Sequence, residues 1–142
     1  MAIDTGKVVV GGLAGGVVIA ILDFVVNGLI LAEQNAAALA ALNPALAENL
    51  ETSAPIAGFI VIDLLFGILL VWTYAAMRPR FGPGPKTAAL AGVQVWLVAL
   101  LVYAAMAFMG IWTWGYLIAG AIASLVMVII GANVGALLYK EA

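Results

Sequence analysis

Residues 87–139 read TAALAGVQVWLVALLVYAAMAFMGIWTWGYLIAGAIASLVMVIIGANVGALLY and contain no acidic or basic side chain. A helix needs about 20 residues to cross a hydrocarbon core of about 30 Å, so this stretch is long enough for two crossings. It is interrupted at 110–115, where two glycines enclose a polar turn rich in indole side chains. The stretch therefore predicts two transmembrane helices, at about 87–109 and 116–139.

Two more apolar stretches precede it, at about 8–32 and 55–77. Charged residues make up 8% of the chain and hydrophobic residues 67%, whereas soluble domains carry about 25% charged residues. The first stretch is too long for the apolar region of a signal peptide, so we expect a retained helix. Lipid requires internally bonded backbone, and barrel strands would alternate in polarity. The sequence predicts an all-α membrane protein, a single domain over 1–142 with a four-transmembrane-helix bundle.

The basic residues give this bundle an orientation. All five flank the N-terminus, the second connection or the C-terminus: Lys7, Arg78, Arg80, Lys86 and Lys140. Because positive charge is retained on the cytoplasmic side, both termini are predicted to lie inside. The connection 78–86 is rich in proline and glycine, so we expect it to be non-helical and to bring its cations to anionic headgroups.

The first connection, the outer loop 33–54, is rich in alanine and leucine. Its leucines recur at helical spacing, and Asn43-Pro44 is typical of a helix N-cap followed by proline at the first helical position. We expect a short interfacial helical segment with its leucines toward lipid and Glu48 and Glu51 toward water. Ser53 is then expected to start the second transmembrane helix.

Aromatic residues flank the predicted spans at both ends. Tryptophan and tyrosine favour the membrane interface. We therefore expect Trp112, Trp114 and Tyr116 to mark the outer surface. Tyr74 and Tyr139, next to basic residues, are expected to mark the inner one.

Small residues recur at helical spacing along the first and last helices. One stripe contains Gly12 and Gly16, and the other contains Gly120, Gly131 and Gly135. Such stripes let helix backbones approach closely, which drives packing where lipid is as apolar as leucine. Packing within one copy is the simpler interpretation. A dimer or larger oligomer is the alternative, and it gains modest support from Asn133, on the opposite side of the last helix.

Two acids lie inside the predicted membrane. Asp23 and Asp63 are both about 12–14 Å from the outer boundary at 1.5 Å per helical residue, on antiparallel neighbouring helices. Asn27 and Tyr103 fall in the same outer half. No basic side chain is available there, and a charged carboxylate in lipid is costly, so we expect the acids to meet with at least one proton held at neutral pH.

This group of four residues has two interpretations. It is either a proton- or cation-coupled site or a hydrogen-bonded lock between two helices. A second polar level, Gln94 and Asn133, lies about 10 Å from the inner boundary by the same arithmetic. We expect these two side chains to form interhelical hydrogen bonds.

The composition also excludes several classes of function. The chain has no cysteine and no histidine, which removes thiolate chemistry and the commonest acid–base residue and metal ligand. No phosphate-binding or nucleophile motif is present. The few cations form no basic patch that would bind nucleic acid. We therefore predict no enzyme activity, no metal site and no cofactor.

The segments 78–86 and 131–141 resemble those of a group of small bacterial four-helix integral membrane proteins of unknown function. This resemblance implies a multi-pass protein of the bacterial inner (cytoplasmic) membrane and carries no residue roles. The function predicted first is a non-enzymatic accessory or assembly component. It would contact the lipid bilayer and either a second copy or another membrane protein. The alternative is a small oligomeric proton- or cation-coupled transporter or channel that uses Asp23 and Asp63.

Overall fold

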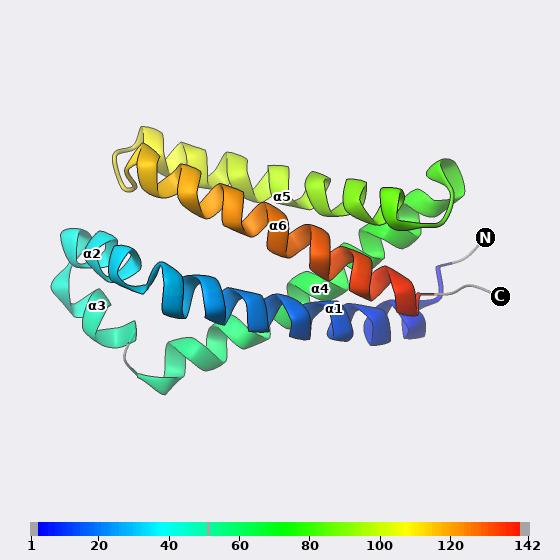
Figure 1. The fold of residues 1–142 in the computed structure, drawn as a ribbon, viewed down its shortest axis with the longest axis horizontal. Helices are drawn as coiled ribbons and strands as arrows, with labels where there is room; N and C mark the ends of the chain where they lie inside the picture. Colours follow the sequence, from blue (N-terminus) through cyan, green and yellow to red (C-terminus); the bar gives the residue numbers. More distant parts are fainter. Residues whose placement is uncertain (1–2, 51, 140–142) are drawn as a thin grey trace.

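The computed structural model describes residues 3–50 and 52–139 (Figure 1). The elements in chain order are α1 (Thr5–Val25), the π-helix η1 (Val26–Ile30), α2 (Ala32–Leu42), α3 (Pro44–Leu50), α4 (Ser53–Phe81), α5 (Pro85–Phe108) and α6 (Trp114–Leu138). The described residues form helices and no strand, so the all-α fold class is confirmed. Four helical runs, Thr5–Ile30, α4, α5 and α6, are long and apolar enough to cross a membrane. The chain thus has the character of a multi-pass helical membrane protein.

Local capping explains where three of the long helices begin. α1 begins before the apolar run because the Asp4 side chain accepts a hydrogen bond from the Lys7 backbone nitrogen at 3.1 Å. α5 begins with Pro85 at its first turn, where no backbone N–H is needed. The Thr113 hydroxyl caps α6 by accepting from the Tyr116 backbone nitrogen at 3.2 Å.

The prediction that 78–86 is non-helical is wrong for most of the segment. α4 continues through Pro79 to Phe81, because a proline in the last turn removes only one backbone hydrogen bond. The helix ends at Gly82, whose φ of 81° favours glycine and whose nitrogen donates to the Arg78 carbonyl at 2.8 Å. The connection is therefore reduced to 82–84.

The first connection contains two short helices, as the sequence predicts. The Asn43 side chain accepts from the Ala45 nitrogen at 3.0 Å, which confirms the N-cap followed by Pro44. α4 begins at Ser53, but Thr52 occupies the cap position and its hydroxyl instead donates to the Asn49 carbonyl. Glu51 lies outside the described residues.

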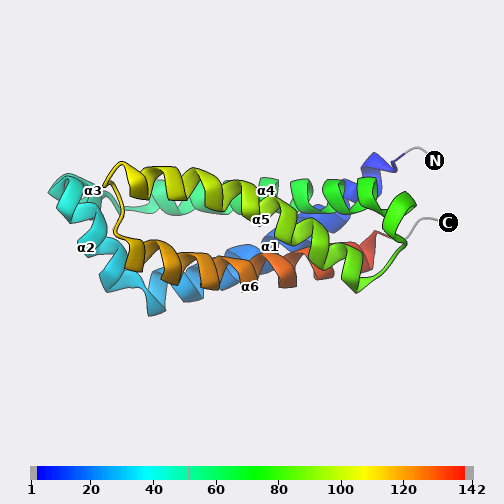
Figure 2. The same ribbon diagram turned by 90° about the horizontal axis from the view of Figure 1, so that it is seen from above.

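The four long helices form an antiparallel bundle (Figures 1 and 2). α1 packs most extensively against α4 and α6, and α5 packs against α6 and α4. Figure 1 shows α6 crossing α1 near the end that holds both termini, then diverging from it toward α2 and α3. The bundle is therefore closed at the terminal end and wider at the opposite end.

Glycine-to-glycine contacts produce the closed end. A Cβ atom built on Gly11 would lie 2.6 Å from the Gly135 carbonyl oxygen, and one on Gly15 would lie 2.6 Å from the Gly131 carbonyl oxygen. Real Cβ atoms do not approach backbone so closely. α1 and α6 can cross at this separation only because these four positions lack side chains.

Gly12 and Gly16, the neighbouring glycines of α1, allow α4 to approach α1 equally closely. A Cβ on Gly16 would lie 2.7 Å from the Leu64 Cα atom, and one on Gly12 would overlap the backbone of Ile68. Gly67, which the sequence analysis did not single out, faces both glycines, and a Cβ there would overlap the Gly12 carbonyl oxygen. Adjacent glycines thus let two neighbours approach α1 at once.

Gly120 differs from the packing role predicted for it. A Cβ atom there would meet no heavy atom within 4 Å. The reason is that α1 and α6 diverge, so the N-terminal part of α6, which contains Gly120, lies away from α1. Helical spacing placed it on the glycine stripe but did not show how far the contact extends.

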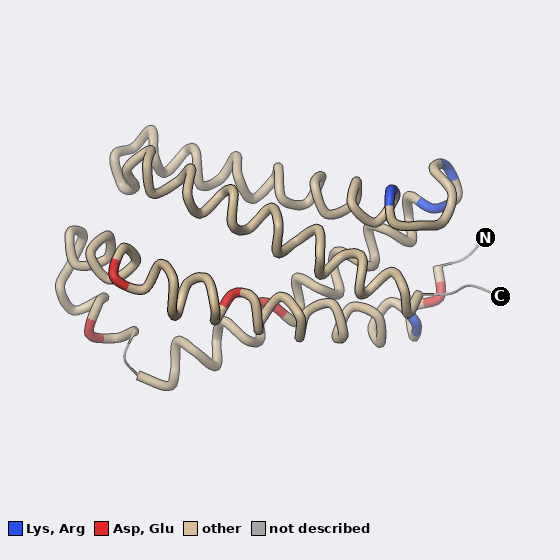
Figure 3. Tube along the Cα trace, in the orientation of Figure 1, with Lys and Arg blue, Asp and Glu red and all other residues tan. Residues whose placement is uncertain are grey.

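The charged side chains and the exposed apolar side chains occupy different positions along the length of the bundle. The described Lys and Arg residues gather at the terminal end (Figure 3), and large apolar side chains dominate the exposed surface between the ends. Tyr74 and Tyr139 lie at this end too, and both are buried within the bundle. Their rings meet edge to face, and the Arg78 guanidinium lies 5.9 Å and 5.4 Å from the two centroids.

The glycine contacts yield the first prediction, a comparison of Gly67→Ala with Gly120→Ala. Alanine ordinarily favours a helix over glycine by about 1 kcal/mol. At Gly67 the new methyl group overlaps the backbone of α1, so we expect a net loss of about 1–3 kcal/mol in the free energy of unfolding. Gly120→Ala has open space and should lose nothing. Unfolding of both variants by SDS in mixed micelles, followed by circular dichroism, measures the difference; equal stability would contradict the close contact.

Candidate functional site

A cavity of about 290 Å³ lies where the four long helices diverge. Its wall includes all four residues proposed from the sequence as the polar site: Asp23, Asn27, Asp63 and Tyr103. It also includes polar and aromatic residues that the sequence analysis did not assign to this site, namely Asn35, Trp96, Trp112, Tyr116 and Ser124. The structure thus brings together the predicted residues and adds a larger second set.

The position of the cavity follows from the glycine contacts. On α1 the face that meets α6 continues from Gly15, at helical spacing, to Ile19 and then to Asp23. Ile19 is buried, and its side chain packs directly against Gly131 of α6. Beyond this side chain the two helices diverge (Figure 1), and Asp23 lies on the cavity wall. On α4, Asp63 lies one turn beyond Gly67 in the same direction.

Asp23 is held by a chain of hydrogen bonds across four elements. The Asn27 amide donates to the Asp23 carboxyl at 2.7 Å. The Asn35 amide, on α2, donates to the Asn27 backbone carbonyl at 3.0 Å and to its side-chain oxygen at 3.3 Å. The Tyr116 hydroxyl, on α6, donates to the Asn35 side-chain oxygen at 2.9 Å. The chain fixes the amide orientations and leaves Asp23 as the terminal acceptor.

The π-helix η1 makes this chain possible. The first predicted span was expected to run as one helix to residue 32, but from Val26 to Ile30 it widens, and Leu31 donates its N–H to the Val26 carbonyl at 2.7 Å. Such wide turns occur frequently at functional sites. Here the turn holds Asn27 and is followed at once by α2, which returns Asn35 to the cavity.

Asp63 is the less constrained acid. It is half-buried, and its carboxyl makes no hydrogen bond within 3–50 and 52–139. It shares the cavity with Asp23, close enough for the two charges to repel. No lysine or arginine belongs to the cavity wall. Two carboxyl groups therefore face one space without a positive side chain between them.

Indole groups complete the wall. The Trp96 indole nitrogen donates to the Ala121 carbonyl and to the Ser124 hydroxyl, both at 3.1 Å. Trp112 packs against the Tyr116 ring at a centroid distance of 5.3 Å. The Trp112 indole nitrogen is buried and has no hydrogen-bond partner among the described residues. These rings come from α5, α6 and the turn between them, so sequence spacing alone could not group them.

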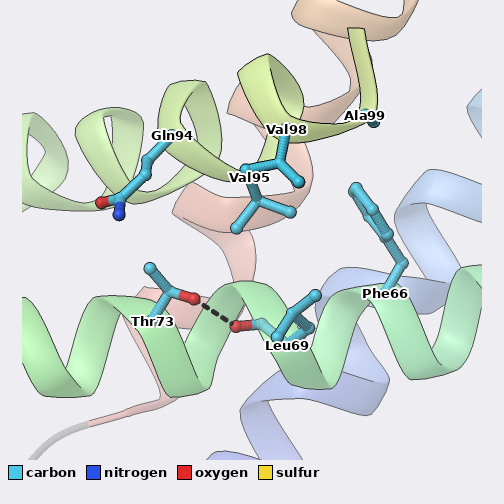
Figure 4. Close-up of a pocket in the computed structure, with 7 residues that line it drawn as sticks. All are labelled: Phe66, Leu69, Thr73, Gln94, Val95, Val98 and Ala99. Carbon is cyan, nitrogen blue, oxygen red and sulfur yellow. Dashed lines mark hydrogen bonds between the residues drawn. The ribbon is translucent and has the colours of Figure 1, made fainter. Parts of the chain in front are cut away.

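The second polar level does not form as predicted. The Asn133 amide donates to the Ile129 carbonyl of its own helix at 2.8 Å rather than across helices. Gln94 is exposed and makes no hydrogen bond within the described part of the chain. It points into an apolar groove of about 320 Å³ between α4 and α5, opposite Thr73 (Figure 4). Thr73 bonds back to the Leu69 carbonyl, so the two side chains do not join the helices.

No protein-family model matches this chain, and no curated protein or solved structure is significantly similar to it.

The hydrogen-bond chain yields a prediction for Tyr116→Phe and Asn35→Ala. The two substitutions remove opposite ends of one bond, so their effects on the free energy of unfolding should be non-additive. We expect a coupling of about 0.5–1.5 kcal/mol, the usual range for polar pairs in membrane bundles. Unfolding of both single variants and the double variant measures it. Tyr103→Phe with Asn35→Ala is the control pair and should be additive; additivity in both pairs would disprove the bond.

Proposed function

We propose that this chain is a non-enzymatic protein of the bacterial inner (cytoplasmic) membrane whose cavity takes up protons or small cations. The observation that carries the proposal is the pair Asp23 and Asp63 on one cavity wall without a basic side chain. The sequence favoured an accessory role because no enclosed space could be inferred from it. The cavity changes that preference, since intramembrane acids that face a cavity commonly bind protons or cations.

The chemistry expected of the pair is an exchange of protons for cations. Two ionised carboxylates in a low-dielectric space repel one another, so one retains a proton while the cavity holds no cation. A cation beside both oxygens offsets the repulsion and lets that proton leave. Asn27 keeps one oxygen of Asp23 engaged, which leaves Asp63 as the freer group for the exchange.

The proposed orientation places both termini and the 82–84 loop in the cytoplasm, with α2 and α3 at the outer interface. Retention of positive charge on the inner side supports it, because the described cations gather at one end (Figure 3). In this orientation the closed, glycine-packed end faces inward. The cavity lies in the outer half, next to α2.

The orientation can be tested with single cysteines, because the natural chain has none. Asn49→Cys in α3 and Pro83→Cys in the inner loop are both exposed positions. A maleimide that cannot cross membranes should label Asn49→Cys in intact spheroplasts and label Pro83→Cys only after lysis. The reverse pattern would refute the orientation.

The accessory role is the second candidate, and the Gln94 groove favours it. An unbonded amide next to lipid is costly, so a helix of a second copy or of another membrane protein would stabilise Gln94 by bonding to it. In this case the protein would assemble with a partner and carry no flux. Deleting the chain would then reduce the partner's stability.

A flux assay separates the two candidates. The protein in sealed vesicles, with an imposed proton or potassium gradient and an internal pH dye, should show a flux that Asp23→Asn with Asp63→Asn abolishes. Glu48→Gln, on α3 and away from the cavity, is the matched control and should leave the flux unchanged. Undiminished flux in the double variant would refute a role for the acids. No flux in any variant would favour the accessory role.

A further inference from the structure

We infer that the cavity binds an organic ammonium cation in preference to a metal ion. This inference rests on the proposed cation site and names its ligand class. The chemistry of the rest of the wall distinguishes between these two kinds of cation, which the acid pair alone does not.

The wall is unusually rich in aromatic rings. Phe66 comes from α4, Trp96 and Tyr103 from α5, Tyr116 from α6 and Trp112 from the turn before it. Ring faces attract cations, most strongly when water is excluded, and they form the cages that recognise alkylated ammonium groups. Rings on three sides and carboxyl groups on α1 and α4 are suited to a cation with an apolar surface.

The oxygens of the wall are poorly suited to a bare metal ion. Hard cations such as Ca²⁺ take six to eight oxygen ligands, and Mg²⁺ needs an octahedral set. The Asn27 and Asn35 side-chain oxygens already accept hydrogen bonds from Asn35 and Tyr116. The Ser124 oxygen accepts one from Trp96. The carboxyl groups and the Tyr103 and Tyr116 hydroxyl oxygens remain. Because Asn27 engages one Asp23 oxygen, these groups supply charge but fewer than six free oxygen ligands.

The volume also indicates a molecule rather than an ion. A water molecule occupies about 30 Å³ of liquid, so 290 Å³ corresponds to about ten waters or one small organic group. This is near the lower limit of small-molecule pockets.

Equilibrium binding of radiolabelled tetraethylammonium to the full chain in lipid nanodiscs tests the inference. We expect saturable binding that equal concentrations of sodium or potassium do not displace. Asp63→Asn should weaken it at least tenfold. Tyr103→Leu, which removes a ring, should weaken it about 3–10-fold, and Tyr103→Phe, which keeps the ring face, should bind nearly as well as the natural chain. Trp114→Phe is the control, because Trp114 is not part of the cavity wall.

Four other outcomes would contradict the inference or the proposed function. Binding that neither Asp63→Asn nor Tyr103→Leu changes would place tetraethylammonium elsewhere and overturn the inference. Binding weakened equally by Tyr103→Leu and Tyr103→Phe would refute the ring as the recognising group. Failure of tetraethylammonium to bind, together with an Asp63-dependent proton or potassium flux, would overturn the organic ligand and leave the proposed function intact. Neither binding nor flux would reject both. Helical circular dichroism of each variant identifies any that fails to fold.

Discussion

The contact of α1 with α6 through glycine backbones is the constraint on which the rest of this structure depends. Gly11 and Gly15 meet Gly135 and Gly131 so closely that no side chain fits between them. Helices that touch at one end and cross at an angle must separate at the other. The first large side chain in the seam, Ile19, ends the contact, and the cavity opens directly beyond it. Packing and cavity are thus two consequences of one arrangement of small residues.

The polar residues follow the same geometry. Acids buried in a tightly packed seam would have no room for water or a ligand, and their desolvation would be severe. Asp23 and Asp63 instead lie one to two turns past the glycines, where the helices have parted. The π-turn and α2 then fold back across the opening, and Asn35 connects Asn27 to Tyr116. The connection between α1 and α4 therefore belongs to the site, although its sequence indicated only a surface segment.

Much of the bundle could be predicted from the sequence, because membrane spans depend on properties that are local in sequence. The apolar runs gave the four long helices, and a rise of 1.5 Å per residue placed Asp23 and Asp63 at one depth. Properties that depend on helix rotation and crossing could not be predicted. Gly120 continued the periodic stripe, yet a Cβ there would meet nothing, whereas Gly67 stood alone and lies against the α1 backbone at Gly12 and Gly16. Gln94 was assigned a partner by depth alone, but it lies in the groove between α4 and α5 and makes no hydrogen bond within the described residues.

The two ends of the bundle differ in a way that bears on any passage of solute. The cationic end is closed, with Arg78 beside the buried rings of Tyr74 and Tyr139. If the proposed cation uptake is coupled to transport, α1 and α6 must part at this end. Glycine seams suit such a motion, because their backbone contacts are individually weak and few side chains, here Ile19 and Val71, pack into them. Leucines in the same seam would interdigitate, and each would have to leave its packing before the helices could separate. The residues that close the bundle are therefore also those that least oppose its opening.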